Sequence, residues 1–244
     1  MAIRMLHSCE LTMLTKHWTS NIVMAAIAIP CFAASNPTLQ RLQVAGTVMD
    51  EIMQSPDNGI PQDLLRKAHC AVVVPGLKKG AFFLGGTYGK GFMTCRQESG
   101  VGWSAPAAIR MEGGGIGLQF GGSETDLVLL VMTEKGADRL MSSQFAFGGE
   151  GTVAAGPVGR QINAETDIKF TNDLFSWSRS RGVFAGISVS GATMRQDQDD
   201  NEDLYGKKYT TVQVIHSGLT SPTEGSKLFS ILNAESSQKI AGRK

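Results

Sequence analysis

The distribution of glycine restricts the folds that this sequence can adopt. The chain has 29 glycines against 8 prolines, and most of the glycines lie inside or between short apolar runs from residue 70 to residue 216. Glycine weakens helices, whereas it permits β-bulges and tight turns. The pattern therefore predicts a strongly bent β-sheet with many glycine turns, and not a flexible linker or a helical bundle.

Helical patterns flank this strand-rich region. Asn36 and Pro37 form a helix start before apolar residues at helical spacing, and Ser221 to Glu224 form a capping box before another apolar face. Helices are expected over 37–53, 62–67, 134–141 and after residue 221. Strands are expected over 70–74, 81–88, 91–96, 101–104, 107–112, 116–121, 126–132, 150–155, 174–180, 182–190 and 208–216. The prediction is an α+β fold: a mostly antiparallel, sandwich-like or barrel-like β-sheet flanked by N-terminal and C-terminal helices, in one domain over 35–244.

The first 34 residues have the order of a secretory signal. Arg4 and Lys16 precede an apolar run at 22–29, and small residues follow up to Ala34. The run is too short to span a bilayer as a stable helix. We therefore predict that residues 1–34 are a signal peptide and that the protein is exported to the periplasm or cell envelope. A lipid anchor at Cys31 and a buried N-terminal helix stay open as alternatives.

The mature chain is expected to carry no net charge. The chain has 23 basic and 22 acidic residues, and removing residues 1–34 takes away Arg4, Lys16 and Glu10, which leaves 21 of each. A nucleic-acid-binding protein would show a broad basic excess, so we expect no nucleic-acid partner. Only Cys70 and Cys95 remain in the mature chain. A disulfide between them and two separate buried thiols both stay open.

The glycine-rich stretches do not match the patterns of nucleotide-binding loops. The stretch GLKKGAFFLGGTYGKGF at 76–92 resembles a P-loop, but Leu84 stands where the first glycine is needed and Gly91 where the hydroxyl is needed. Gly113 to Gly117 fails the dinucleotide pattern because Phe120 occupies the third glycine position. We therefore predict no cofactor.

The sequence also lacks a recognisable catalytic or metal motif. The acidic run 197–203 fails the EF-hand pattern at Glu202 and Lys208, and we interpret it as a solvated hairpin tip. No G-x-S-x-G motif is complete, and the mature chain has only His69 and His216 as imidazole bases. We therefore predict that the protein is not an enzyme, with a hydrolase that uses one of these histidines as the least supported alternative.

Basic residues beside aromatic residues form the candidate binding site. Two lysines lie in a Pro–Gly loop, a third lies at a glycine turn, and two arginines flank Ser180. The candidate residues are Lys78, Lys79, Lys90, Arg179 and Arg181, with Phe82 and Tyr88 as aromatic neighbours. Ammonium and guanidinium groups bind phosphates, and aromatic rings settle at the depth of lipid headgroups. This combination favours binding of anionic phospholipids at a membrane surface.

Several segments together resemble the SYLF family of lipid-binding domains. The segments are Val74–Gly80, Gly85–Gly91, Gly102–Ala107, Gly117–Gly121, Thr125–Met132, Gly156–Arg160 and, most specifically, Ser178–Ser188. They occur in the family's order over roughly residues 40–235. The sequence departs from the family at Ser190, where an acidic residue often stands.

The resemblance implies a non-enzymatic module that binds anionic phospholipids. Some fungal members also bind actin, but we carry over only the anionic membrane lipid, because an exported protein would meet neither actin nor phosphoinositides. The alternative is a structural or protein-interaction domain of the cell envelope without lipid specificity. In that case the glycine-rich sheet would dock an envelope protein partner or a second copy in a homo-oligomer, and an exposed amphipathic helix over 37–53 would be the discriminating feature.

Overall fold

The computed structural model describes residues 36–55, 59–82, 84–97, 99, 101–115, 121–147, 153–156, 173–180, 183–186 and 191–236. Residues Ser35–Lys244 form one compact unit. The predicted signal peptide, with Cys31, lies outside the described residues. None of the helices in the described part of the chain is long and apolar enough to cross a bilayer.

The core of the fold is one curled β-sheet. Its strands are β1 (Cys70–Phe82), β2 (Leu84–Cys95), β3 (Ala107–Gly115), β4 (Gly121–Val131), β5 (Gln144–Ala146), β6 (Val153–Ala155), β7 (Leu174–Ser180), β8 (Val183–Gly186) and β9 (Ala192–Gln196). The strand order is β5-β9-β3-β2-β1-β4-β7-β6, with β8 also pairing with β7. Of the described pairings only β6 with β7 is parallel. The prediction of an α+β fold with a mostly antiparallel, barrel-like sheet is confirmed.

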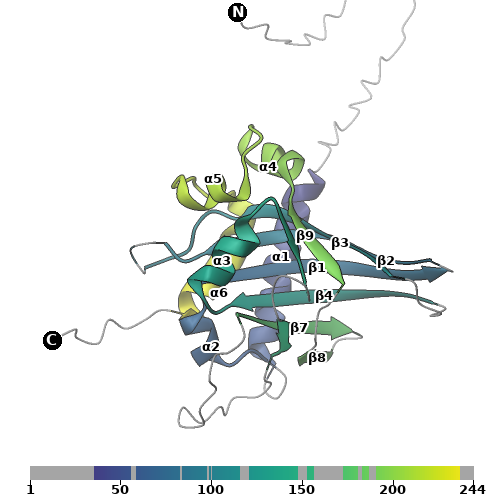
Figure 1. Ribbon diagram of the computed structural model, residues 1–244. Coiled ribbons are helices and arrows are strands. Elements are labelled where there is room, and N and C mark those ends of the chain that lie inside the picture. Colours follow the sequence, from purple (N-terminus) through teal and green to yellow (C-terminus); the bar gives the residue numbers. More distant parts are fainter. Residues whose placement is uncertain are drawn as a thin grey trace, which may run out of the picture. The chain divides into compact units, whose positions relative to one another are not determined.

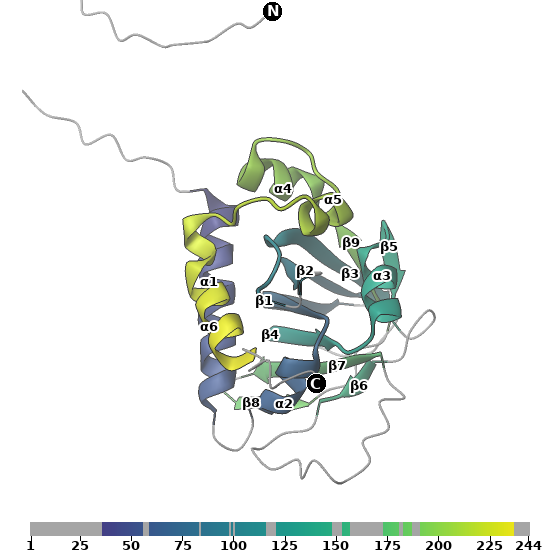
Figure 2. The same cartoon turned by 90° about the vertical axis from the view of Figure 1, so that its left-hand side faces the viewer.

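Helices cover both sides of the curl, as Figure 2 shows. They are α1 (Pro37–Gln54), α2 (Gln62–Lys67), α3 (Glu134–Met141), α4 (Gln198–Tyr205), α5 (Thr211–His216) and α6 (Ser226–Ser236), the last preceded by the 3-10 turn η1 (Thr223–Gly225). We call the sheet side under α1, α2 and α6 the helix face, and the side toward α3 and α5 the inner face. Val73, Phe92 and Trp177 are buried on the helix face, and Val72 and Met93 on the inner face.

The helix α1 packs on the helix face of the sheet through its apolar side. Asn36 caps it, with Oδ1 accepting a hydrogen bond from the Thr38 amide at 2.8 Å, and Pro37 occupies the first turn, as the sequence predicts. Leu42 and Met49 are completely buried between α1, α6 and the sheet. The expectation that this helix is exposed is therefore wrong for its apolar side, which carries Leu42 and Met49.

Two segments were assigned the wrong local structure from sequence. Residues 208–216, expected as a strand, contain α5, which Thr210 and Gln213 open with a reciprocal capping box. The acidic run 197–203, expected as a solvated hairpin tip, is the first part of α4, with Asp197 as its N-cap. Asp197 and Asp200 are buried because one side of α4 packs against the sheet and α1, whereas Asp199 and Glu202 are exposed.

The stretch 76–92 is a long β-hairpin in place of the expected loop and separate strands. Lys78 and Lys79 lie within β1, paired on one side with β2 and on the other with β4, and Lys90 lies within β2 and not at a turn. The strands β1 to β4 extend beyond the helices at the end of the sheet that contains this hairpin (Figure 1). We call this part the projecting end. It consists of residues 78–82, 84–88, 112–115 and 121–125.

A β-bulge separates the covered part of β1 from the projecting end. The register between β1 and β2 shifts between Val73 and Lys78, and Gly76 in this stretch has a positive φ of 60° that favours glycine. Gly91 lies beneath the bulge, where an added Cβ would be 2.8 Å from the Cα of Val74 and would clash with the Val73 carbonyl oxygen. Glycine here lets two backbones approach closely.

Cys70 and Cys95 form a disulfide across the start of β1 and the end of β2. The two residues are directly opposite each other in the strand register, and both are buried on the inner face. Of the two alternatives left open by the sequence, the cross-link is the one that the structure contains.

The two kinds of glycine should respond differently to the same substitution. Gly91→Ala should lower the free energy of unfolding by roughly 1–3 kcal/mol, because the added methyl group meets main-chain atoms of β1 that cannot rotate away. Gly80→Ala is the matched control, because nothing lies within 4 Å of a Cβ built there. That variant should change the free energy by no more than about 0.5 kcal/mol. Equal destabilisation in urea-unfolding curves would contradict the assignment of Gly91 to backbone packing.

Candidate functional site

The structure divides the predicted site residues into three groups. Lys90 and Arg179 belong to separate ion-pair clusters at the two ends of α1. Lys78, Lys79 and Tyr88 lie together on the projecting end, and Phe82 is the last residue of β1, opposite Leu84. Arg181 lies outside the described residues.

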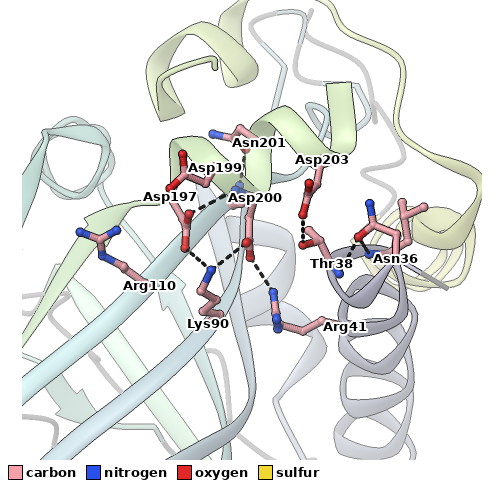
Figure 3. Close-up of polar contacts among 12 residues, drawn as sticks. Asn36, Thr38, Arg41, Lys90, Arg110, Asp197, Asp199, Asp200, Asn201 and Asp203 are labelled. Carbon is pink, nitrogen blue, oxygen red and sulfur yellow. Dashed lines mark hydrogen bonds and ion pairs between the residues drawn. The ribbon is translucent and has the colours of Figure 1, made fainter. Parts of the chain in front are cut away.

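Lys90 is the centre of a buried ion-pair cluster beneath α4, shown in Figure 3. Its Nζ lies 2.7 Å from Asp200 Oδ1 and 2.8 Å from Asp197 Oδ2. The second Asp200 oxygen accepts from Nη1 of Arg41, on α1, at 2.6 Å. The side chains of Asp197 and Asp200 are only 2% and 9% exposed, and they balance the charges of Lys90 and Arg41, whose side chains are 25% and 24% exposed. We call these four residues the α4 cluster.

Hydrogen bonds from α4 hold the α4 cluster in place. Asp197 Oδ1 accepts from the Asp200 amide at 3.2 Å, which caps α4. Asn201 Oδ1 accepts from the Ala108 amide at 2.7 Å, and its Nδ2 donates to the Tyr209 carbonyl at 2.9 Å. Thr38 donates its hydroxyl to Asp203 at 2.8 Å. The helix α4 is thereby fixed to β3 and to the start of α1.

The charges of the α4 cluster shift the pKa of Lys90. Burial by itself lowers the pKa of this ammonium, but hydrogen bonds and attraction from Asp197 and Asp200 outweigh burial, and the pKa is raised above the ordinary 10.5. A raised pKa stabilises the folded state at all pH values below 10.5, and this contribution is lost as the pH rises through the folded-state value. Lys90 is therefore a firmly protonated structural cation at neutral pH.

Arg179 forms the second cluster, at the far end of α1. Its Nε donates to Asp126 Oδ2 at 2.8 Å, its Nη2 lies 2.6 Å from the same oxygen, and its Nη1 pairs with Glu51 of α1. The other Asp126 oxygen accepts from the Gly76 amide at 2.9 Å. Burial raises the pKa of Asp126; the Gly76 amide lowers it, and the charge of Glu124 raises it. Arg179 thus connects β7, β4 and α1.

Lys78, Lys79 and Tyr88 lie on the exposed surface of the projecting end. Lys78 is directly opposite Tyr88 on β2 and Glu124 on β4, and Lys79 is opposite Thr87 and Ser123. Both lysines are exposed, and Tyr88 is half exposed. Since side chains alternate along a strand, Lys78 lies on the helix face with Tyr88, and Lys79 lies on the inner face. The adjacent lysines therefore point away from each other.

The acidic and imidazole groups outside the two clusters have other surroundings in the described part of the chain. Asp199 pairs with Lys208 at 2.6 Å, and no group of three or more histidine, cysteine or acidic residues in the described part of the chain could hold a metal ion. His69 is exposed, and His216 lines a half-open pocket of about 310 Å³. Arg96 at that pocket donates to the carbonyls of Leu65, Arg66 and Ala68 and lies over Trp103, so it serves to end α2.

Sequence reasoning missed the carboxylate partners of the predicted cations. Asp197 and Asp200 are three positions apart, which is the spacing of an N-cap to its third helical residue, and the Thr210–Gln213 capping box carries the same kind of signal for the next helix. These two patterns could have revealed the α4–α5 pair. No local pattern connects Arg41 to Asp200, because the two residues are 159 positions apart.

Comparison with known proteins agrees with this architecture. The family described as "Ysc84: Las17-binding protein actin regulator" matches residues 112–235, which is half of the chain. The chain belongs to the SYLF (Ysc84) domain family. The match includes the C-terminal half of the sheet and the α4, α5 and α6 helices, so the acidic partners of Lys90 lie within the matched segment.

Curated relatives extend the similarity through the β1–β2 hairpin. The chain is 31% identical over 181 residues to SH3 domain-containing YSC84-like protein 1 of Xenopus laevis, covering 73% of this chain and 53% of that protein. It is 32% identical over 181 residues to LAS seventeen-binding protein 3 of Saccharomyces cerevisiae, covering 73% and 39%. It is 30% identical over 179 residues to SH3 domain-containing protein PJ696.02 of Schizosaccharomyces pombe, covering 72% and 41%. The chain thus spans about half or less of these relatives.

Removal of the Lys90 charge should destabilise the fold. Lys90→Met should lower the free energy of unfolding by roughly 3–5 kcal/mol, because Asp197 is left buried without its cation and Asp200 keeps only Arg41. Lys208→Met is the control, since the Lys208 and Asp199 side chains are 55% and 75% exposed and exposed ion pairs contribute little to stability. Urea unfolding at neutral pH measures both. A Lys90→Met variant as stable as Lys208→Met would contradict the structural role of the α4 cluster.

Proposed function

We propose that this SYLF domain binds anionic phospholipid headgroups at a membrane surface through Lys78 and Lys79, with Tyr88 beside Lys78. The observation that carries the proposal is the position of these three residues on the exposed surface of a sheet end that extends past the helices (Figure 1). Exposed ammonium groups attract an anionic surface at about 1 kcal/mol each, and a half-exposed tyrosine ring suits headgroup depth. The site requires no catalytic residue, and we propose a non-enzymatic role.

The proposed site is smaller than the sequence predicts. A phosphate at Lys90 would have to displace Asp197 and Asp200, and one at Arg179 would have to displace Asp126 and Glu51. Displacing a buried carboxylate from its cation costs more than one surface phosphate contact returns. We therefore place Lys90 and Arg179 in the scaffold that holds the projecting end.

The alternative is a protein-interaction domain. It is favoured by the descriptions of the family as a Las17-binding actin regulator and of one relative as LAS seventeen-binding protein 3. For this chain an anionic lipid is supported by the two exposed lysines of the projecting end, where Glu124 lies opposite Lys78. If the domain binds a protein and not an anionic lipid, any binding of the chain to vesicles should not depend on vesicle charge.

We further propose that the protein is exported and matures in an oxidising compartment. The Cys70–Cys95 disulfide supports this, because such bonds persist in secreted and periplasmic proteins and are rare where thiols are kept reduced. The order of residues 1–34 is the second support.

Intact-protein mass spectrometry of the natively produced protein tests the export proposal. We expect a chain that begins near residue 35, without free thiols at Cys70 and Cys95, because signal cleavage and oxidation accompany export. An N-terminus at Cys31 with an added lipid mass would reveal the anchored alternative. A chain that retains residues 1–34 and has two reduced cysteines would contradict export.

Charge reversal at the projecting end should abolish vesicle binding. Lys78→Glu/Lys79→Glu should reduce co-sedimentation with phosphatidylglycerol vesicles by more than tenfold, since two attractive charges become repulsive. The same change at Lys135, an exposed lysine on α3, is the matched control and should have little effect. Phosphatidylcholine vesicles control for charge, and moderate salt should weaken the binding.

The lipid proposal fails if the wild-type chain binds neutral and anionic vesicles equally, or binds neither. It also fails if the control variant and the double variant lose binding to the same extent. Circular dichroism of each variant separates loss of binding from loss of folding.

A further inference from the structure

We infer that Arg110 and Arg195 form a binding site for a phosphate group on the helix face of the sheet. The inference goes beyond the proposed function, because neither arginine belongs to the projecting end that carries Lys78 and Lys79. The phosphate group can belong to a small phosphate ester or to a lipid headgroup. Both present the same kind of oxygen acceptors to a pair of guanidinium groups.

The strand register places the two arginines side by side. Arg110 on β3 is directly opposite Arg195 on β9, so their Cα atoms are about 5 Å apart. Ile109 and Met194, which precede them in the sequence, are buried on the inner face, and both arginines therefore lie on the helix face. The side chains of Arg110 and Arg195 are 35% and 41% exposed, so a ligand in solution can reach both.

The pair has more positive than negative charge around it. Like charges directly opposite each other destabilise a pair of strands. Glu112 lies between the two arginines, with Oε1 at 2.8 Å from Arg110 Nε and Oε2 at 3.6 Å from Arg195 Nε. Two guanidinium groups and one carboxylate carry a net charge of +1. This charge attracts a further anion.

The contact with Glu112 leaves hydrogen-bond donors unused on both arginines. Both Nε atoms are buried, and neither forms a hydrogen bond with the described part of the chain. The carboxylate oxygen near Arg110 is close enough but poorly aligned with the N–H group, and the one near Arg195 is too distant. Buried donors normally have an acceptor, so these two N–H groups indicate a ligand.

The neighbouring charges on the same face are already engaged. Lys90, opposite Arg110 on β2, is held by the two carboxylates of the α4 cluster. Figure 3 shows Arg110 beside this cluster, with its guanidinium group directed away from Lys90. Asp199 pairs with Lys208 at 2.6 Å, and its pKa is lowered chiefly by Lys208 and least by Arg110. Asp199 therefore does not serve as the acceptor for the arginine pair.

Two adjacent guanidinium groups suit a phosphate better than a second carboxylate. A carboxylate has two oxygens, which one guanidinium group fills in a bidentate contact. Glu112 instead offers a single oxygen to each arginine. A phosphate group has enough oxygens to accept from both guanidinium groups, whose planar donor pattern matches it. A phosphate held between Arg110 and Arg195 would also offset their mutual repulsion.

Thermal unfolding of the full chain measures the binding. Inorganic phosphate and glycerol 3-phosphate, at an ionic strength kept constant with sodium chloride, should raise the melting temperature, because both ligands bind the folded state. Arg110→Gln and Arg195→Gln, made singly, should each weaken the binding about tenfold, since each removes a charged donor group. Arg139→Gln should leave the binding unchanged and is the matched control, because Arg139 is 38% exposed and pairs with Asp173.

Glu112→Gln separates a phosphate site from a purely structural pair of arginines. The substitution removes an anion that competes with phosphate for the same donors, so phosphate should bind about threefold more tightly. The same variant should be less stable than the wild type when phosphate is absent, because the two guanidinium groups then repel each other without the carboxylate between them. A purely structural pair predicts this loss of stability without a gain in phosphate affinity.

Co-sedimentation of Arg110→Gln with phosphatidylglycerol vesicles identifies the source of the phosphate. Weaker co-sedimentation than wild type assigns the site to a lipid headgroup, and unchanged co-sedimentation assigns it to a free phosphate ester. The inference is overturned if phosphate raises the melting temperature no more than chloride does. It is also overturned if the two arginine variants respond like Arg139→Gln, or if Glu112→Gln does not bind phosphate more tightly. Lipid binding through Lys78 and Lys79 stands or falls separately, by the charge-reversal experiment.

Discussion

The buried attraction between Lys90, Arg41, Asp197 and Asp200 is the interaction on which the arrangement of this domain depends. It joins β2, α1 and α4, elements from opposite ends of the chain, and the Arg179–Asp126–Glu51 cluster makes the corresponding connection at the far end of α1. Ion pairs hold both ends of α1, and the apolar side of this helix is buried on the sheet. The helix α1 therefore covers the helix face as far as the β-bulge in β1. The projecting end lies beyond this bulge.

These ion pairs divide the basic residues into structural and exposed ones, although both kinds have similar neighbours in the sequence. Lys90 and Arg179 sit beside aromatics and glycines just as Lys78 and Lys79 do, but the first two neutralise carboxylates within the fold. The same division applies to glycine. Gly91 allows β1 and β2 to approach at the bulge, whereas a Cβ added to Gly80 would meet nothing within 4 Å and one added to Gly86 only the Gly113 carbonyl oxygen, at 3.8 Å. Residue type alone predicts neither division, because each depends on which strand or helix lies opposite.

The predictions that succeeded rest on local physics. The start of α1 at Asn36 and Pro37, the Thr133-capped α3, the apolar β1 segment 70–74 and the overall α+β class follow from capping, periodicity and strand propensity. Those that failed depend on distant contacts. The acidic run was interpreted as solvated because its partners, Lys90 and Arg41, lie more than one hundred residues away. A polar segment such as Gln198–Tyr205 is interpreted as exposed when the cations that pack against it are not known from the sequence.

We propose that Lys78 and Lys79 meet the lipid while Lys90 stays within the protein. Amine-reactive labelling followed by peptide mass spectrometry, with and without phosphatidylglycerol vesicles, tests it directly on the unaltered chain. We predict that Lys78 and Lys79 label readily in solution and are protected by vesicles, while Lys90 labels slowly in both conditions because its ammonium is held by two carboxylates. Lys78 and Lys79 labelling equally with and without vesicles, or Lys90 labelling as fast as they do, would contradict the claim.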